Sequence, residues 1–204
     1  MIYDISMTIH PKMAVYKNRP EKFPQITQVN FFEKEGHYET ELKMNLHTGT
    51  HIDYPLHMLK DSFDSAIENL KALIGPAKVF DLTYVLDSID LKDIENLNIQ
   101  ENDFILFKTK NSFTEEFKDN FIYLNESGAN YLAKKKIRGV GIDTLGIERA
   151  QAGNPTHKIL LGNKIIILEG LRLKEINEDE YMLYCLPIKI AKVEASPVRA
   201  ILIK

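Results

Sequence analysis

The stretch His47-Thr48-Gly49-Thr50-His51-Ile52-Asp53-Tyr54-Pro55-Leu56-His57 holds three of the six histidines of the chain, with an aspartate between the second and the third. The three histidines and the aspartate all stand at odd positions, and alternate side chains of an extended segment point to the same face. Gly49, Thr50 and Pro55 disfavour a helix here. No glutamate follows His47, which excludes the helical His-Glu-x-x-His zinc motif. We therefore predict a strand that enters a turn at Tyr54-Pro55 and directs all four side chains to one point.

Neutral imidazole and carboxylate groups are good ligands for a divalent cation such as Zn²⁺. His47, His51 and Asp53 would supply three ligands and leave a coordination position open, as catalytic metal sites do. Two residues elsewhere are candidates to complete the site: His157, which follows a Gly153-Asn154-Pro155 turn, and Glu169, which ends an aliphatic run. Each of these two, taken alone, reads as a surface histidine or a solvated strand end. Three histidines within eleven residues instead point to metal binding or catalysis.

Other reactive residue types are predicted to be structural. Cys185 is the only cysteine, which excludes an intrachain disulfide, and its apolar neighbours predict a buried and inert thiol. Asp143 ends a short apolar run and is assigned a structural role. His10 and His37 stand alone and are assigned to the surface.

Composition limits the classes of function. The 204 residues are 44% hydrophobic and carry a net charge of -3, with a sequence pI of about 6.1. The one basic cluster, Lys134-Lys135-Lys136, ends a predicted helix and stabilises its C-terminal turn, so we expect no nucleic-acid partner. No apolar run approaches the length of about 18 residues that a membrane span needs, and the N-terminus lacks a leader pattern. We expect a soluble, cytoplasmic protein that acts on a small molecule.

Periodicity predicts one mixed α/β domain over residues 1–204, with a sizeable sheet. Strands are predicted at 2–6, 26–33, 38–46, 77–82, 104–108, 140–143, 165–168, 181–188 and 199–203, and helices at 92–96 and 125–136, with helical turns within 63–73. Asn125 is the predicted N-cap of the longer helix. The second and third strands form a hairpin around Gly36-His37, and the alternation of Leu42, Met44 and Leu46 predicts one buried face, opposite to His47. The polar segment 7–24 is either a binding loop or a plain surface loop.

The eleven-residue stretch resembles the signature of the cyclase-like metal-dependent hydrolases, a family that includes bacterial kynurenine formamidases and isatin hydrolases. The likeness continues through Leu73-Ile74-Gly75-Pro76-Ala77, the segment Arg138–Thr144, Pro155-Thr156-His157-Lys158 and Ile167-Leu168-Glu169-Gly170-Leu171. The resemblance implies a swivelling β/β/α fold with a mixed sheet and a homodimer or homotetramer.

The resemblance also implies a metal centre, with two Zn²⁺ ions per chain and with Mn²⁺ or Fe²⁺ as alternatives. His47 and His51 would bind the first ion, Asp53 and Glu169 would bridge both ions, and His157 would bind the second. His57 would be the acid/base residue.

The activity implied is hydrolysis of a C–N bond in a small amide, a formamide or a cyclic amide by metal-activated hydroxide, as in an arylformamidase. Two alternatives stay open: a related enzyme that hydrolyses or dehydrates another small carbonyl compound, and an inactive protein that binds a metal or a small ligand. The segment Val15–Pro20 departs from the Trp-Pro-Gly-Asp sequence of kynurenine formamidases. Tyr16 stands in the place of the tryptophan as a substrate-binding candidate, and Lys17 and Arg19 favour an anionic substrate.

Overall fold

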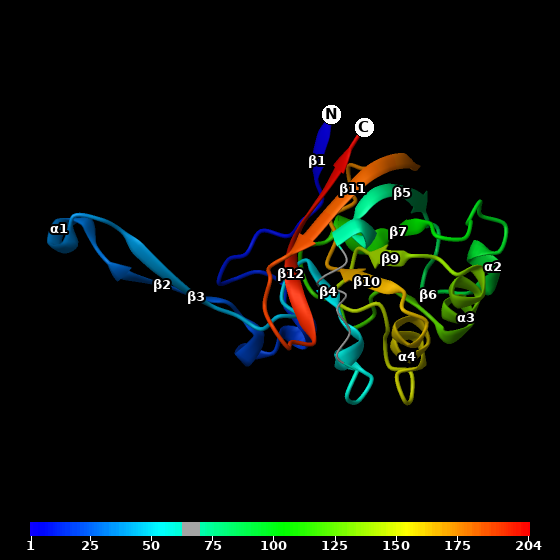
Figure 1. Ribbon diagram of the computed structural model, residues 1–204, viewed down its shortest axis with the longest axis horizontal. Helices are drawn as coiled ribbons and strands as arrows, with labels where there is room; N and C mark the ends of the chain where they lie inside the picture. Colours follow the sequence, from blue (N-terminus) through cyan, green and yellow to red (C-terminus); the bar gives the residue numbers. More distant parts are fainter. Residues whose placement is uncertain (63–69) are drawn as a thin grey trace.

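A closed barrel of mixed strands forms the body of the protein in a computed structural model that describes residues 1–62 and 70–204 (Figure 1). Eight strands pair in the order β1-β12-β11-β5-β7-β9-β10-β4, and an additional pairing between β12 and β4 closes the ring. The strands are β1 Ile2–Asp4, β4 His51–Asp53, β5 Ile74–Asp81, β7 Phe104–Lys108, β9 Gly139–Ile142, β10 Ile166–Glu169, β11 Asp179–Pro187 and β12 Ala195–Ile203. This is the mixed α/β fold that the sequence predicts. It brings Glu169 of β10 opposite His51 of β4.

Two hydrophobic clusters share the side chains of the central strands. β5, β7, β9 and β10 run parallel to one another. Along β7, Phe104 and Leu106 join the cluster that fills the barrel, whereas Ile105 and Phe107 join the cluster under the helices, as the alternation of strand side chains requires. Helices α3 (Glu126–Lys135) and α4 (Pro155–Gly162) lie side by side over this second cluster (Figure 1). The site elements are therefore fixed on both sides by buried apolar contacts.

Several local predictions are confirmed. The Asn125 side chain accepts a hydrogen bond from the Gly128 amide at 3.1 Å and caps α3. β7 has the predicted bounds, and α2 (Leu91–Ile94) lies where a short helix was expected. Cys185 is fully buried, and burial raises the pKa of its thiol to about 12, so the thiolate is scarce at neutral pH. His10 and His37 are exposed.

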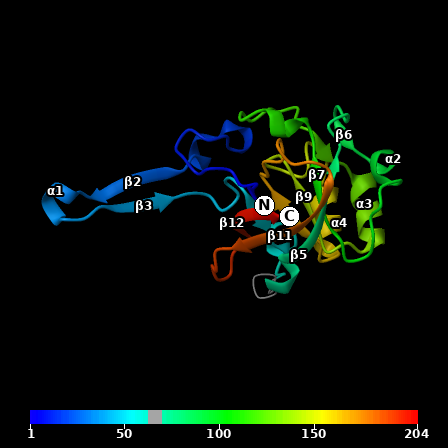
Figure 2. The same cartoon turned by 90° about the horizontal axis from the view of Figure 1, so that it is seen from above.

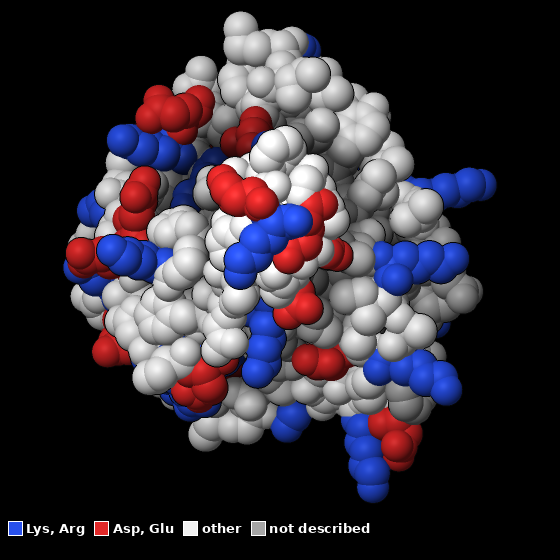
Figure 3. Space-filling view, turned by 90° about the vertical axis from the view of Figure 1, so that its left-hand side faces the viewer, with Lys and Arg blue, Asp and Glu red and all other residues white. Residues whose placement is uncertain are grey.

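The predicted hairpin exists, but it stands away from the barrel as an arm, defined here as residues 25–43 (Figures 1 and 2). It consists of β2 Gln25–Asn30, the helical turn α1 Phe32–Glu35 and β3 Glu39–Lys43, so both strands are shorter than predicted. Leu42 is 54% exposed. The predicted buried face is therefore wrong at Leu42, because no part of the described body lies beneath the arm, whereas Met44 and Leu46 beyond the arm are half-buried. Figure 3 views the arm from its tip, where side chains of both charges gather.

One helical segment differs from expectation, and another is described only in part. The sequence predicts a turn before His157, yet Pro155 begins α4, a position in a helix that proline favours. Of the helical turns expected within 63–73, residues 63–69 lie outside the described residues, and Leu70–Ala72 forms a short 3-10 helix. The smaller elements are 3-10 helices at Tyr16–Asn18, Pro20–Lys22, Pro55–His57 and Lys110–Phe113, and strands β6 Ser88–Ile89 and β8 Tyr123–Leu124. Over the described residues, no helix has the length and apolar character that crossing a bilayer would need.

Candidate metal centre

The four side chains of the eleven-residue stretch converge, but a single strand does not carry them. Only His51–Asp53 is extended. His47 lies in a turn that Gly49 reverses with a φ of +75°, and a Cβ there would lie 2.7 Å from Ile9 Cδ1. His57 ends the 3-10 helix that begins at Pro55, as the predicted turn requires. The prediction of one continuous strand is therefore wrong, because the positive φ of Gly49 folds His47 back over β4.

Hydrogen bonds within the stretch and to neighbouring segments fix its shape. Thr50 Oγ1 donates to the Gly170 carbonyl at 2.6 Å and accepts from the Met7 amide at 2.8 Å. His51 Nδ1 lies 2.8 Å from the Gly49 carbonyl, which can only accept, so Nδ1 carries the proton. Nε2 is therefore the nitrogen that faces the interior of the site, and it is the atom that would lose its proton to bind a metal.

Two carboxylates, one on each of the paired strands β4 and β10, each face the same two histidines. Asp53 Oδ1 lies 3.5 Å from His51 Nε2, and Asp53 Oδ2 lies 3.7 Å from His157 Nε2. Glu169 repeats the pattern, with Oε2 at 3.3 Å from His51 Nε2 and Oε1 at 3.5 Å from His157 Nε2. His47 Nδ1 lies 2.9 Å from Asp53 Oδ1. The structure thus brings together all five residues that the sequence predicted as ligands.

The residues present fit divalent cations. Ligand atoms of a tetrahedral zinc site lie about 3.3 Å apart, close to most of these separations and longer than good hydrogen bonds. Apart from the histidine–carboxylate contacts just described, His51 Nε2 and both carboxylate oxygens of Asp53 are buried without a hydrogen-bond partner among the described residues. Buried polar atoms are nearly always paired, so these three atoms point to a missing partner. His51, Asp53 and Glu169 also bring one ligand atom each within 4.8 Å of one another.

The charges of the site also favour cations. Burial and the Glu169 carboxylate raise the pKa of Asp53, but His47 and His51 outweigh them and leave it below its ordinary value. Burial would lower the pKa of His157, yet Glu148 and Glu169 raise it to about 10. Buried carboxylates that need protonated histidines as counter-charges are the groups that a bound metal would neutralise instead.

His57 has two readings in this geometry. Its ring centroid lies 4.2 Å from that of His47, and His47, Asp53 and His57 form a second group with ligand atoms within 4.8 Å. His57 also faces an open pocket, and burial lowers its pKa, which favours a neutral ring. The arrangement suits either a proton carrier or an additional ligand.

A pocket of about 330 Å³ opens onto the ligand atoms. His57, His157 and Glu169 form one part of its lining, and Tyr16 and Lys17 form another. Its remaining lining includes Lys22, His47, Met58, Leu145, Gly146, Glu148, Ala150 and Asn154. Arg19, which the sequence offered as a contact for an anionic substrate, is not among the lining residues. The segment 7–24 contacts the pocket through Tyr16 and Lys17 of its first 3-10 helix and Lys22 of its second.

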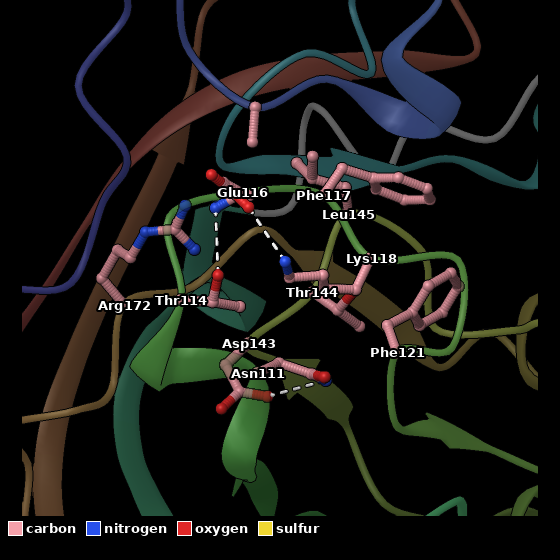
Figure 4. A pocket seen from close by; sticks show the side chains of 11 residues that line it. Asn111, Thr114, Glu116, Phe117, Lys118, Phe121, Asp143, Thr144, Leu145 and Arg172 are labelled. Atoms are coloured by element: carbon pink, nitrogen blue, oxygen red, sulfur yellow. Dashed lines mark hydrogen bonds and ion pairs between the residues drawn. The ribbon is translucent and has the colours of Figure 1, made fainter.

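A second, smaller cavity lies beside Leu145 and is shown in Figure 4. Its volume of about 30 Å³ has room for little more than one water molecule. Asp143 stands at its floor and accepts hydrogen bonds from the amides of Thr109 and Ser112 and from their hydroxyl groups, at 2.6 to 3.1 Å. These bonds give Asp143 the structural role that the sequence suggested.

The sequence motifs do not predict two acidic residues that lie near the ligands. Glu148 Oε2 accepts a hydrogen bond from His157 Nδ1 at 2.7 Å, and Glu194 Oε1 lies 3.5 Å from His47 Nε2. Neither stands in a motif with histidines. Glu148 lies in the loop between β9 and α4 and Glu194 directly precedes β12, so these residues meet the ligands only in the folded chain.

Comparison with known proteins gives relatives over the whole chain. The model of the Cyclase family, described as "Putative cyclase", matches residues 3–149. Cyclase-like protein 2 of Oryza sativa subsp. japonica is 36% identical over 81% of this chain, and the match spans 65% of the rice protein, less than two thirds of its length. A kynurenine formamidase of Erythrobacter litoralis is 30% identical, over 98% of this chain and 93% of that protein.

Solved structures share the fold. A structure described as a predicted metal-dependent hydrolase from Bacillus stearothermophilus is 49% identical with a TM-score of 0.92, and the match covers 99% of this chain and 97% of that chain. Isatin hydrolase A from Labrenzia aggregata has a TM-score of 0.86 at 23% identity, over 99% of this chain and 93% of that chain, which is a likeness of fold.

Proposed function

Because the chain belongs to the Cyclase family, we propose that residues 1–204 form one metal-dependent hydrolase domain that cleaves a C–N bond in a small amide, formamide or cyclic amide. The observation that carries the proposal is the placement of Asp53 and Glu169, each of which faces both His51 and His157. The names of the Erythrobacter and Bacillus relatives support the same class of reaction.

The ligands divide between two ions in this proposal. His47 and His51 hold the first ion, His157 holds the second, and Asp53 and Glu169 contact both. Imidazole and carboxylate ligands favour Zn²⁺, with Mn²⁺ or Fe²⁺ as alternatives. When bound, such ions supply the hydrolytic nucleophile at neutral pH and polarise the carbonyl of the substrate.

His57 is assigned the proton transfer. It stands on the pocket side of the ligands, and its lowered pKa keeps the ring neutral and able to accept a proton. The same ring then donates that proton to the leaving nitrogen. The pocket also holds Leu145 and Met58 as apolar contacts for the rest of a small substrate.

A substrate panel tests the proposal. The zinc-loaded protein is expected to hydrolyse at least one compound among N-formyl aromatic amines and lactams, and His57→Asn is expected to keep the metal and lose turnover. A variant that loses the metal would make His57 a ligand. Zinc binding without turnover of any amide, lactam or ester would instead favour a binding protein.

An anionic group on the substrate is expected to contact Lys17 and Lys22. Both ammonium groups lie 5.4 Å from the centroid of the Tyr16 ring at the pocket, and neither forms an ion pair with a described residue. The Lys22 carbonyl accepts a hydrogen bond from Thr48 Oγ1 at 3.1 Å, which ties this segment to the metal-site stretch.

Lys22→Ala is therefore expected to raise KM about tenfold for amides that carry a carboxylate, since a charge-assisted hydrogen bond contributes about 1.5 kcal/mol or more. KM for uncharged amides should stay unchanged. Exposed Lys189, outside the pocket lining, gives the matched control Lys189→Ala. Equal effects on KM for charged and uncharged substrates would show that Lys22 does not contact the carboxylate of the substrate.

We also propose that the protein is a homodimer or homotetramer held in part by the arm. The arm exposes large apolar side chains away from the body: Ile26, Val29, Phe31, Phe32, Tyr38 and Leu42 are 39% to 62% exposed. A two-stranded hairpin is marginally stable alone in water, so a covering partner would stabilise it.

Replacing Phe31, Phe32 and Tyr38 together by serine is expected to shift the assembly towards the monomer, because it removes apolar area from the interface. Light scattering during size-exclusion chromatography measures the mass. Leu86→Ser, at a side chain that is 76% exposed outside the arm, is the control. A wild type that is monomeric, or a triple variant with unchanged mass, contradicts the role of the arm.

A further inference from the structure

The loop after β9 is firmly anchored before it reaches the site. Asp143 begins the loop and holds it through four hydrogen bonds to Thr109 and Ser112. Further along, the Ile147 carbonyl accepts a hydrogen bond from the Leu124 amide at 2.8 Å. Ile147 and Glu148 therefore have fixed positions relative to the barrel.

Glu148 uses both carboxylate oxygens on the first turn of α4. Oε2 accepts hydrogen bonds from the backbone amide of His157 at 3.1 Å and from Nδ1 of the same residue at 2.7 Å. Oε1 accepts from Gln151 Nε2 at 2.7 Å and from the Thr156 amide at 3.3 Å. The residue is only 5% exposed. Glu148 thus caps the helix and fixes the His157 ring at the same time.

The neighbouring residue, Ile147, fixes the side chain of Glu169. The Ile147 amide donates a hydrogen bond to Glu169 Oε1 at 2.6 Å. With His157 Nδ1 engaged by Glu148, the Nε2 atom faces Glu169 Oε1 at 3.5 Å and Asp53 Oδ2 at 3.7 Å. Two consecutive residues therefore orient the two side chains that come from outside the eleven-residue stretch.

We propose that Glu148 is a positioning residue for the second metal ion: its carboxylate fixes the His157 ring so that Nε2 faces Asp53 and Glu169, with which it would hold that ion, while the Ile147 amide fixes Glu169. The inference rests on the two-ion assignment made above. A carboxylate on the far nitrogen of a ligand histidine holds its ring orientation and makes the ring a stronger ligand. The hydrogen bonds of Glu148 go to Gln151, Thr156 and His157, and none joins it to His47 or His51, which would hold the first ion.

Zinc competition separates this role from a purely structural one. Zinc stoichiometry and affinity are measured against a chromogenic chelator for wild type, Glu148→Ala, Glu148→Gln and Gln151→Ala, together with thermal unfolding of the zinc-free proteins. Gln151→Ala is the matched control, because it removes a cap contact of Glu148 without touching His157.

The expected result is selective. Glu148→Ala should lower the affinity for one of the two zinc ions about 10- to 100-fold and leave the affinity for the other unchanged. Glu148→Gln keeps a hydrogen-bond acceptor for Nδ1 but loses the charge, so its loss should be smaller. Gln151→Ala should lower the unfolding temperature and leave both zinc affinities unchanged.

Three results overturn the inference: unchanged zinc affinities in Glu148→Ala, equal weakening of both ions, or a wild type that binds fewer than two ions. Only the last of these also contradicts the metal assignment. A wild type that binds two zinc ions but hydrolyses nothing contradicts the proposed function alone. A failure of the positioning role of Glu148 can therefore be distinguished from a failure of the proposed hydrolase function.

Discussion

Replacing Asp53 by alanine is expected to abolish both metal binding and hydrolysis. Asp53 is the residue whose two oxygens face His51 on one side and His157 on the other, so its loss removes a ligand from both ions. The metal content of the purified variant should fall from about two ions per chain to a background level. Elemental analysis and the turnover assay check the two halves of this expectation.

The zinc-free Asp53→Ala protein should be only modestly less stable than zinc-free wild type. Asp53 is buried and faces the like charge of Glu169, but the contacts of its carboxylate with His47 and His51 outweigh both and leave its pKa below the ordinary value. Its removal therefore costs some stability at neutral pH, and the variant should still unfold in one cooperative transition. Thermal unfolding without metal therefore controls for misfolding. A variant with full metal content and full activity would show that Asp53 does not bridge the ions.

Replacing Gly170 by alanine is expected to cause the largest loss of stability. A Cβ there would lie 2.4 Å from the Gly49 carbonyl oxygen and 2.9 Å from its carbon, and the φ of Gly170 is +70°. The clashing atoms are backbone, and they belong to the turn that positions His47 and His51. We expect a loss of about 3–5 kcal/mol, or about 10 °C in Tm, from strain and overpacking together.

Gly153→Ala is the matched control for this substitution. Gly153 has a φ of +81° and no heavy atom within 4 Å of the position of a Cβ, so it measures the backbone cost alone, about 1 kcal/mol. Calorimetry of both variants separates the two contributions. Equal melting temperatures would mean that the contact between Gly49 and Gly170 does not constrain the site.

The site residues that follow local chemistry were predictable from the sequence. Histidines and a carboxylate packed into eleven residues have few structural explanations, and Glu169 was visible as a charge at the end of a buried strand. Their convergence was predicted for a partly wrong reason, since alternation along one strand does not bring His47 to the site. The positive φ of Gly49 does so, and a glycine in the sequence does not state which φ it adopts.

Features that depend on distant contacts were not predictable. Glu148 meets His157 only because α4 turns back over the barrel, and the prediction missed that helix. Leu42 alternates like a half-buried strand residue, yet it lies in an arm that has no described neighbour beneath it. Hydrophobic periodicity shows that a face is apolar, but it does not show which surface covers it.

Anomalous diffraction from crystals of the zinc-loaded protein tests the central claim most directly. The proposed assignment predicts two zinc peaks per chain, one contacted by His47 and His51, the other by His157, and both by Asp53 and Glu169. A single peak, or two peaks without a shared carboxylate ligand, would contradict the two-ion site on which the proposed hydrolysis depends.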